Sequence, residues 1–313
     1  MRRHEYRRMS IAARGIAYQA DVAWPGCSTP LAGRRREASA WRRSLARAGL
    51  AWLCCVPLCA GAADGDVGAD GGADVGAGAG DYKLTLGRYH LASPGNASNA
   101  GTASPSTNGT DLNLRWRRDA RSLWLGLYQQ PGFGRQWRVG WDDQWPLALG
   151  NATALRRWLP LQLLPSLQAA SGGFVGGSLG VQAGAPFYGQ IGIGRTNLKP
   201  YANLNFDPND ALTLALGWQG EGSRQVALSV IADDRLGTGQ QHHHLTLRWP
   251  LPPGLRLSAD LLHKQGQGDG GAVNAWGWTL GLDGAAWFAR LARDPKQNFS
   301  AQDAWRLSGG RRF

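Results

Sequence analysis

The segment ALTLALGWQ (residues 211–219) places its large apolar side chains, three leucines and a tryptophan, at every second position. Successive side chains of a β-strand point to opposite faces, so this spacing predicts a strand with one apolar face and one small or polar face. The same alternation recurs in DLNLRWRR (111–118), HLTLRW (244–249) and GLRLSADLL (254–262). What covers the apolar faces of these strands decides the fold.

About fourteen alternating segments follow one another from Tyr82 to the end of the chain, with no helical period between them. A soluble β-sandwich has the same alternation, but a closed barrel accommodates this many strands better than one sandwich does. Short predicted turns also alternate with long loops, as in barrels that span an outer membrane. The turns are RDARS (118–122), AGAP (183–186), GEGS (220–223), PLPPG (250–254) and LDGA (282–285), and the loops are residues 92–109, 196–209, 232–241, 264–273 and 293–302.

Tryptophan residues occur at two levels along the predicted strands, one next to the short turns and the other near the opposite strand ends. The first group consists of Trp116, Trp141, Trp158, Trp218, Trp249 and Trp287, and the second of Trp137, Trp276 and Trp305. Amphipathic indole rings favour the boundary between membrane and water. The two groups therefore predict the two aromatic girdles of a membrane-spanning barrel.

The last ten residues, AWRLSGGRRF (304–313), form an alternating segment that puts Trp305, Leu307 and the terminal Phe313 on one face. This segment resembles the C-terminal assembly signal of Gram-negative outer-membrane β-barrel proteins, in which a terminal Phe follows apolar residues at alternate positions. Arg311 departs from that pattern, although at the membrane edge its long side chain can reach the headgroups. The resemblance covers residues 82–313 at the level of architecture, and it implies the barrel assembly machinery as a partner.

These features predict an all-β protein, a transmembrane antiparallel up-and-down β-barrel of about 14 strands. Twelve strands is the alternative, if residues 145–164 form a long turn. The barrel is expected to occupy residues 82–313, to lie in the cell outer membrane and to contact outer-membrane lipids and lipopolysaccharide. The sequence leaves open whether it is a monomer or a small oligomer.

The first 62 residues predict a presequence that carries a signal peptide. The stretch WRRSLARAGLAWLCCVPLCAGA (41–62) combines arginines, a short apolar run and an Ala-Gly-Ala end, the three parts of a cleavable secretory signal. Residues 63–81 are rich in Gly, Ala and Asp, so they cannot bury enough apolar surface to fold. They predict a flexible linker between the signal peptide and the barrel.

The formal net charge of +12 is concentrated in the presequence. Residues 1–62 carry a net charge of +8, which leaves +4 for the rest of the chain, so no nucleic-acid partner is predicted. All four cysteines, Cys27, Cys54, Cys55 and Cys59, also lie in this part. The exported chain therefore has no disulfide framework and no thiolate nucleophile or ligand.

The faces opposite the apolar ones are expected to line the barrel interior, and they are rich in arginine. The predicted lumen-lining residues are Arg115, Arg117, Arg138, Arg248, Arg256, Arg290, Arg306 and Arg312, against Asp142, Asp260 and Asp283. Arginines around a narrow hydrated passage favour anions. Two interpretations remain open: a narrow, anion-leaning, porin-like channel, or a closed structural barrel in which these charges pair across the lumen.

The alternative function is an outer-membrane enzyme that hydrolyses phospholipid or lipid A, or transfers their acyl chains. Such hydrolysis needs a hydroxyl nucleophile, a histidine base and a group that orients the histidine. Ser229, His244 and Asp233 are the candidates at the extracellular mouth, although Ser229 and His244 are expected to point into the barrel. No cofactor is predicted.

The loop NLNFDPNDA (203–211) places the oxygen donors Asp207, Asn209 and Asp210 close together, which is the ligand chemistry that Ca²⁺ prefers. The loop lacks the length and the repeated carboxylates of a dedicated calcium loop. Asp-Pro and Asn-Asp are also ordinary turn sequences. A turn is therefore favoured over a metal site.

Overall fold

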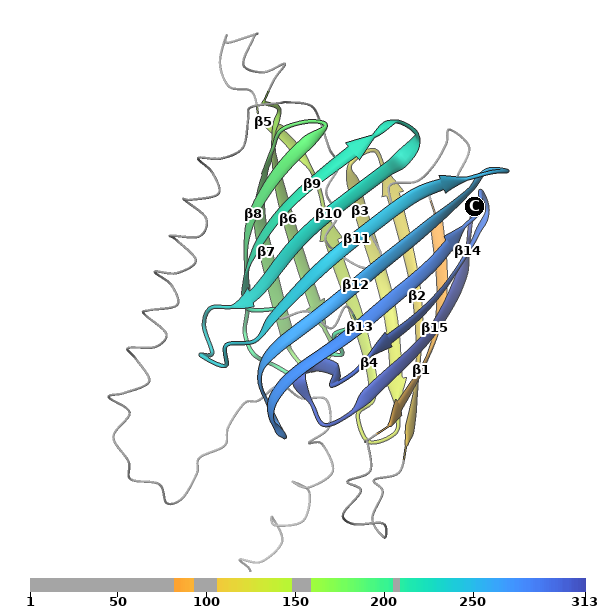
Figure 1. Ribbon diagram of the computed structural model, residues 1–313. Helices are drawn as coiled ribbons and strands as arrows, with labels where there is room; N and C mark the ends of the chain where they lie inside the picture. Colours follow the sequence, from red (N-terminus) through yellow and green to blue (C-terminus); the bar gives the residue numbers. More distant parts are fainter. Residues whose placement is uncertain (1–81, 93–105, 148–158, 205–208) are drawn as a thin grey trace, which may run out of the picture.

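The computed structural model describes residues 82–92, 106–147, 159–204 and 209–313. The presequence and linker predicted for residues 1–81 lie outside these ranges. In the described part, antiparallel strands form one sheet that closes on itself as a barrel (Figure 1). No helix among the described residues is both long and apolar enough to cross a membrane.

The sheet follows the order of the chain: apart from β4 and β5, which both pair with β6, each strand is hydrogen-bonded to its sequence neighbours, and β1 pairs with β15. The strands are β1 (Tyr82–Ala92), β2 (Thr107–Arg118), β3 (Arg121–Gln130), β4 (Gly134–Asp142), β5 (Trp145–Leu147), β6 (Leu161–Ala170), β7 (Phe174–Ala183), β8 (Phe187–Thr196), β9 (Ala211–Gly220), β10 (Arg224–Asp233), β11 (Gln241–Leu251), β12 (Leu255–Gly268), β13 (Gly271–Asp283), β14 (Trp287–Asp294) and β15 (Asp303–Arg312). Two short 3-10 turns, η1 (Glu221–Ser223) and η2 (Gln297–Phe299), lie in connections.

The short strand β5 continues β4, because both pair with β6 in one unbroken register. That register runs from Arg138 opposite Ala170 to Leu147 opposite Leu161. With β4 and β5 counted as one, the described residues form a closed antiparallel up-and-down barrel of fourteen strands, which confirms the predicted fold. The alternative of twelve strands is wrong, because residues 145–147 and 161–170 extend the sheet and only part of 145–164 lies between strands.

The apolar face of every strand points away from the barrel axis. Leu216, Leu228 and Leu245, which are neighbours across β9, β10 and β11, are all exposed, and Leu228 exposes 60% of its surface. A soluble protein buries such a row in its core. Here the row is exposed, and the opposite face of the same strands carries the buried side chains. The exterior is therefore built to meet an apolar environment.

The exposed tryptophans form two levels on this exterior. Trp249 and Trp287 lie near one end of the barrel, and Trp137, Trp276 and Trp305 lie near the other; all five are at least 40% exposed. Trp145, at the end of the continued β4, adds to the first level. Trp158 lies outside the described residues.

We call the end of the barrel that holds Tyr82 and Phe313 the terminus end, and the opposite end the loop end. Tight connections at the terminus end follow β2, β7, β9, β11 and β13, as predicted. The predicted long loop at residues 264–273 is wrong, because β12 and β13 extend until only residues 269–270 separate them. The polar and glycine side chains there alternate as strand residues, and they mimic a loop by composition alone.

The barrel closes where β1 meets β15, and the last residue completes the seam. Tyr82 and Phe313 exchange both backbone hydrogen bonds at 3.1 Å, and their rings stack with centroids 5.9 Å apart. Leu307, Gly309, Arg311 and Phe313 all face outward, in the register expected from the sequence. The terminal Phe is therefore a structural part of the closure.

We expect Leu228→Arg to destabilise the barrel in lipid bilayers by ~2–4 kcal/mol, the cost of a lipid-facing arginine near mid-strand. Denaturant unfolding of barrels folded into vesicles measures this free energy. Leu236→Arg is the matched control, because Leu236 is exposed in the connection between β10 and β11 and should lose almost nothing. Equal stability of both variants would contradict a lipid-facing exterior.

Candidate functional site: the barrel lumen

The arginines predicted to line the lumen all lie on the inward face of their strands. The structure gives each a polar or aromatic contact, and that of Arg117 is with the exposed turn after β2. Arg115 lies 3.8 Å from Asp142, Arg117 donates to the Asp119 carbonyl, Arg138 pairs with Asp111, Arg248 donates to Gln225, Arg256 lies 3.6 Å from Asp283, Arg290 lies over the Phe288 ring, Arg306 donates to the Leu204 carbonyl, and Arg312 pairs with Asp283.

Three guanidinium groups surround one carboxylate in the terminus half of the lumen, and a fourth lies near them. Asp283 lies 3.6 Å from Arg256 and 2.6 Å from Arg312, and the field of Arg290 also acts on it. Arg256 in turn feels the charges of Arg248, Arg290 and Arg312. We call these four arginines, with Asp283, the arginine cluster. It carries a net positive charge on the walls formed by β11 to β15.

Lys83 extends this positive region along β1. Its ammonium group lies 4.5 Å from the centroid of the Phe288 ring, and the guanidinium groups of Arg290 and Arg312 both lie 5.4 Å from that centroid. An aromatic face attracts cations, so one ring holds three of them close together. Phe288 therefore helps the barrel to tolerate like charges side by side.

The loop half of the lumen contains two buried ion pairs. Arg138 pairs with Asp111, and Lys264 pairs with Asp294; all four side chains are almost completely buried. Sequence reasoning missed the second pair, because Lys264 was assigned to a loop and Asp294 to the start of another. The signal was present: Lys264 continues the inward series of Arg256, Asp260 and Leu262 at every second position.

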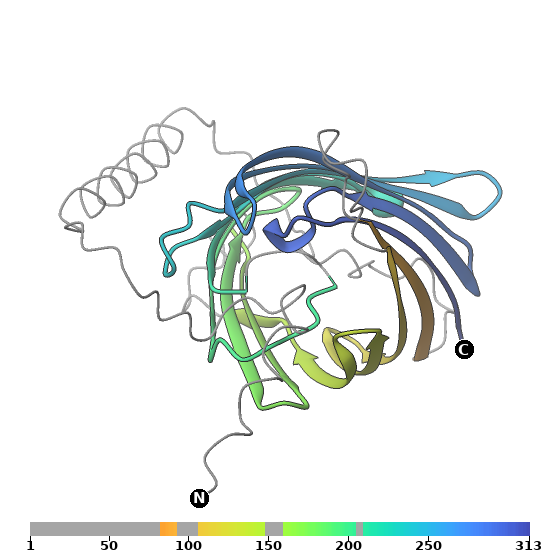
Figure 2. The ribbon, with the colours of Figure 1, turned by 90° about the horizontal axis from the view of Figure 1, so that it is seen from below.

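The connection between β8 and β9 crosses the lumen (Figure 2). Residues 197–204, the crossing loop, are held by side chains of β4 and β15 that bind their backbone. Gln136 donates to the Pro200 carbonyl and accepts from the Ala202 amide, and Arg138 donates to the Ala202 carbonyl at 3.1 Å. Arg306, from β15, donates to the Leu204 carbonyl at 3.0 Å. The crossing loop thus narrows the loop half of the barrel.

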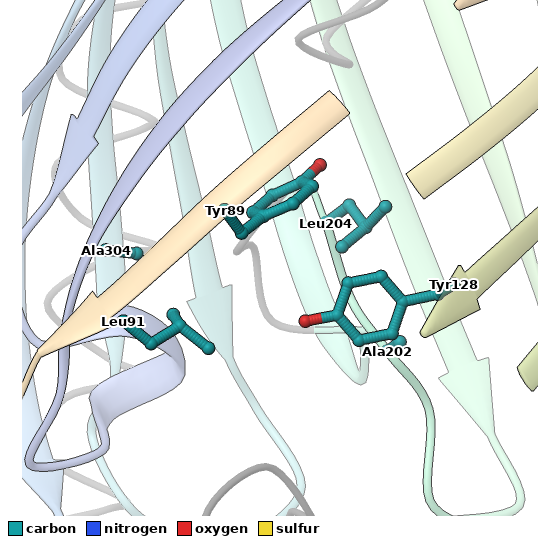
Figure 3. Close-up of a cluster of buried hydrophobic side chains, with 6 residues drawn as sticks. All are labelled: Tyr89, Leu91, Tyr128, Ala202, Leu204 and Ala304. Carbon is teal, nitrogen blue, oxygen red and sulfur yellow. The ribbon is translucent and has the colours of Figure 1, made fainter. Parts of the chain in front are cut away.

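An apolar cluster fixes the tip of the crossing loop. Ala202 and Leu204 pack against Tyr89, Leu91 and Tyr128 on the opposite wall, together with Ala304 (Figure 3). Tyr201 stacks on Phe174 with centroids 4.2 Å apart and donates to Gln168. Burial raises the pKa of Tyr201 above its ordinary value. Inward aromatic residues of the strands therefore form the surface against which the crossing loop packs.

A second connection, between β14 and β15, also folds inward. Its turn η2 places Phe299 against His242, with ring centroids 5.3 Å apart, and both side chains are buried. The Lys264 ammonium group lies 5.8 Å from the Phe299 centroid and donates to the Lys296 carbonyl. Two inward connections from different sides therefore share the loop half of the lumen.

Water still reaches part of the lumen, along the wall formed by β2, β4, β6 and β7. Ser166 and Ser178 point inward, with hydroxyls 2.7 Å apart, and Ser178 is exposed. Arg115 and Asp142 keep 22% and 40% of their side chains accessible. Neighbouring inward positions, such as Gly180 and Gly192, carry no side chain at all. The wall opposite the arginine cluster thus combines accessible polar side chains with residues that have little or no side chain.

Ser229 and His244 are direct partners across β10 and β11 and share the inward face. Asp233 does not orient His244, because its carboxylate accepts from the backbone amides of Arg235, Leu236 and Thr238 and from the Thr238 hydroxyl. Asp260 lies beside His244 instead, 3.0 Å from its Nδ1 atom.

The carboxylate of Asp210 is committed to protein partners. It accepts from the Thr196 hydroxyl and from Arg235, and Asn209 accepts from Asn203. Asp207 lies outside the described residues. Among the residues that are described, no three His, Cys, Asp or Glu side chains are placed to hold a metal ion.

No family model matches the sequence, and no curated protein matches it. Several solved outer-membrane proteins have a similar structure. Omp33 of Acinetobacter baumannii matches with a TM-score of 0.43 and 10% identity, over 75% of this chain and 99% of that one. The KdgM porin, solved with oligogalacturonate, matches with a TM-score of 0.36 and 8% identity, over 73% and 99%. The NanC porin matches with a TM-score of 0.37 and 8% identity, over 74% and 100%.

We expect Gln136→Leu to loosen the crossing loop, because it removes hydrogen bonds to Pro200, Ala202 and Ser171. At ~1 kcal/mol per hydrogen bond, amide exchange in residues 197–204 should speed up by about tenfold or more. Hydrogen exchange with mass spectrometry measures this rate. Gln129→Leu, on the outward face of β3, should leave it unchanged; equal exchange in the two variants would contradict this attachment.

Proposed function

We propose that this protein is a narrow, anion-preferring channel of the Gram-negative outer membrane. The proposal has three parts, namely the membrane placement, the passage and the charge preference, and each rests on a different feature of the barrel.

The exterior supports the membrane placement. Outward leucines such as Leu228 and Leu307 form a band between the two levels of tryptophans. A closed ring of strands also satisfies its own backbone hydrogen bonds, which is the condition for a sheet to lie in hydrocarbon. In such barrels the short turns face the periplasm, so we place the terminus end there and the loop end outside.

The interior supports a passage that is narrow. Fourteen strands leave room beyond what wall side chains fill, but the crossing loop and η2 take up much of that room in the loop half. The accessible side chains of Arg115, Asp142 and Ser178 mark where water remains. A solute would pass along this wall and not through the centre of the barrel.

The arginine cluster carries the charge preference. A single carboxylate, Asp283, lies among Arg248, Arg256, Arg290 and Arg312, and the next inward strand, β1, adds Lys83. These arginines are buried in the wall opposite the accessible side chains, so they act on a solute through their electric field across the lumen. In low-dielectric surroundings such a field raises the local concentration of anions. The two ion pairs of the loop half do not offset this excess, because the charges within each pair neutralise each other.

We expect discrete conductance in planar bilayers, with a reversal potential in a salt gradient that reports anion preference. Arg290→Gln should lower the ratio of anion to cation permeability by at least about twofold, the effect of one charge at ~8 Å in a wet pore. Asp283 keeps Arg256 and Arg312 in this variant, so folding should be preserved. Arg311→Gln, an outward arginine at the same end, is the matched control.

A lack of discrete conductance in protein that has inserted into the bilayer would favour the closed structural barrel instead. A shift of equal size in Arg290→Gln and Arg311→Gln would show that the arginine cluster does not set the preference.

A hydrolase is the second candidate, and one observation favours it. Ser229, His244 and Asp260 follow one another across β10, β11 and β12, with Asp260 in the position that orients a histidine base. The inward direction of these side chains favours a solute in the lumen over a lipid in the bilayer. Thr246 also donates to Asp260, which gives the carboxylate an ordinary structural role.

The hydrolase candidate predicts that purified protein cleaves small esters or phospholipids and that His244→Ala abolishes the cleavage. The channel proposal predicts that neither the wild type nor His244→Ala cleaves these substrates and that both conduct. His263→Ala is the matched control, because His263 faces outward on β12. Loss of cleavage in His244→Ala alone would establish the enzyme.

A further inference from the structure

The outward face of β1 changes character toward the loop end. Leu84 and Leu86 are followed at the next two outward positions by Arg88 and His90, both exposed. On β14 the outward series ends in the same way, with Leu291 followed by exposed Arg293. Basic side chains thus stand on the exterior of neighbouring parts of the barrel, where other strands carry apolar residues.

Strand pairing brings these basic residues together around one tryptophan. On β15, which lies between β14 and β1, Trp305 is the direct partner of both Arg293 and His90, and Leu307 is the partner of Arg88. The Arg293 guanidinium group lies 5.9 Å from the Trp305 ring centroid. We call Arg88, His90, Arg293 and Trp305 the exterior basic patch. It lies at the level of the loop-end tryptophans.

A single carboxylate of the described exterior, that of Asp303, stands near this patch. Among the outward strand positions that the structure describes, the only acidic residue is Asp303, which accepts from the Lys296 amide. The neighbouring connection, residues 93–105, contains no Asp or Glu in its sequence. Arg88 and His90 bind the neutral side chains Thr110 and Asn108. The patch therefore presents net positive charge to its surroundings.

Another outward arginine shows the contrasting arrangement. Arg195, at the loop end of β8, forms two hydrogen bonds with the carboxylate of Asp234, at 2.9 and 2.7 Å. Here the protein supplies the anion itself, in the paired geometry that arginine prefers. Among the described residues, neither Arg88 nor Arg293 pairs with a carboxylate in this way, so both guanidinium groups can bind an anion from outside.

We infer that the exterior basic patch binds the phosphate groups of lipopolysaccharide in the outer leaflet. The loop end reaches the outer leaflet in the placement proposed above, on which this inference rests. Arg88 and Arg293 stand on strands two spacings apart, ~10 Å, which suits a headgroup with more than one phosphate. Guanidinium groups bind phosphate in pairs of hydrogen bonds, and an indole at the interface contacts the sugar and the upper acyl chains.

The test is the amount of lipopolysaccharide that remains bound to the full chain extracted from outer membranes, measured by native mass spectrometry. Arg88→Gln with Arg293→Gln should reduce it roughly tenfold, the effect of removing two interfacial charges. Arg311→Gln, an outward arginine at the terminus end, is the matched control and should retain it. The double Lys variant at positions 88 and 293 keeps both charges and should restore most of the binding.

Equal retention by the wild type and the double Gln variant would overturn the inference, and so would wild type that carries no lipopolysaccharide. Displacement of lipopolysaccharide by inorganic phosphate at ~10 mM would assign the patch to free phosphate, because a multivalent lipid should resist a competitor that binds through a single phosphate. Equal binding of phosphatidylglycerol vesicles would assign the patch to any anionic lipid. Conductance separates the two proposals. If only this inference fails, the protein still inserts and conducts; if the placement fails, no variant partitions into vesicles.

Discussion

The closure of the sheet between β1 and β15 is the constraint on which the rest of the structure depends. A sheet edge in hydrocarbon would leave a row of backbone N–H and C=O groups without partners, at a cost of several kcal/mol each. The two-way hydrogen bonding of Tyr82 and Phe313 ends that edge at the terminus end. Once the barrel is closed, the pleat of each strand points successive side chains alternately outward and inward. The apolar exterior and the charged lumen follow from this.

Charges in the closed lumen have little water to solvate them, so they need partners within the protein. The structure provides two kinds of partner. Some opposite charges form ion pairs, as Lys264 and Asp294 do. Arg138 and Arg306 also donate hydrogen bonds to backbone carbonyls of the crossing loop. Two arginines of the lumen therefore also hold the segment that narrows its loop half.

Parts of the lumen followed from the sequence, and others did not. The inward direction of Arg256 and Arg312 needs only the strand period. The partner of His244 needed the registers of three strands, since Asp260 is sixteen residues away and Asp233, closer in the chain, is turned to its own loop. Lys264 was missed because glycines and glutamines around it have the composition of a loop, although β12 continues through them. The composition of a segment indicates only which secondary structure it prefers, whereas pairing with a neighbouring strand determines which one it adopts.

The sequence by itself determined the all-β barrel, its inner and outer faces and the aromatic levels, because these depend on a period of two that any strand imposes on its own residues. Only the tertiary structure decided that residues 197–204 cross the lumen, that η2 folds inward, and that Arg88 and Arg293 meet around Trp305. These arrangements join segments far apart in the chain. They depend on the register of each strand pair and on the closure of the ring, and no local pattern encodes either.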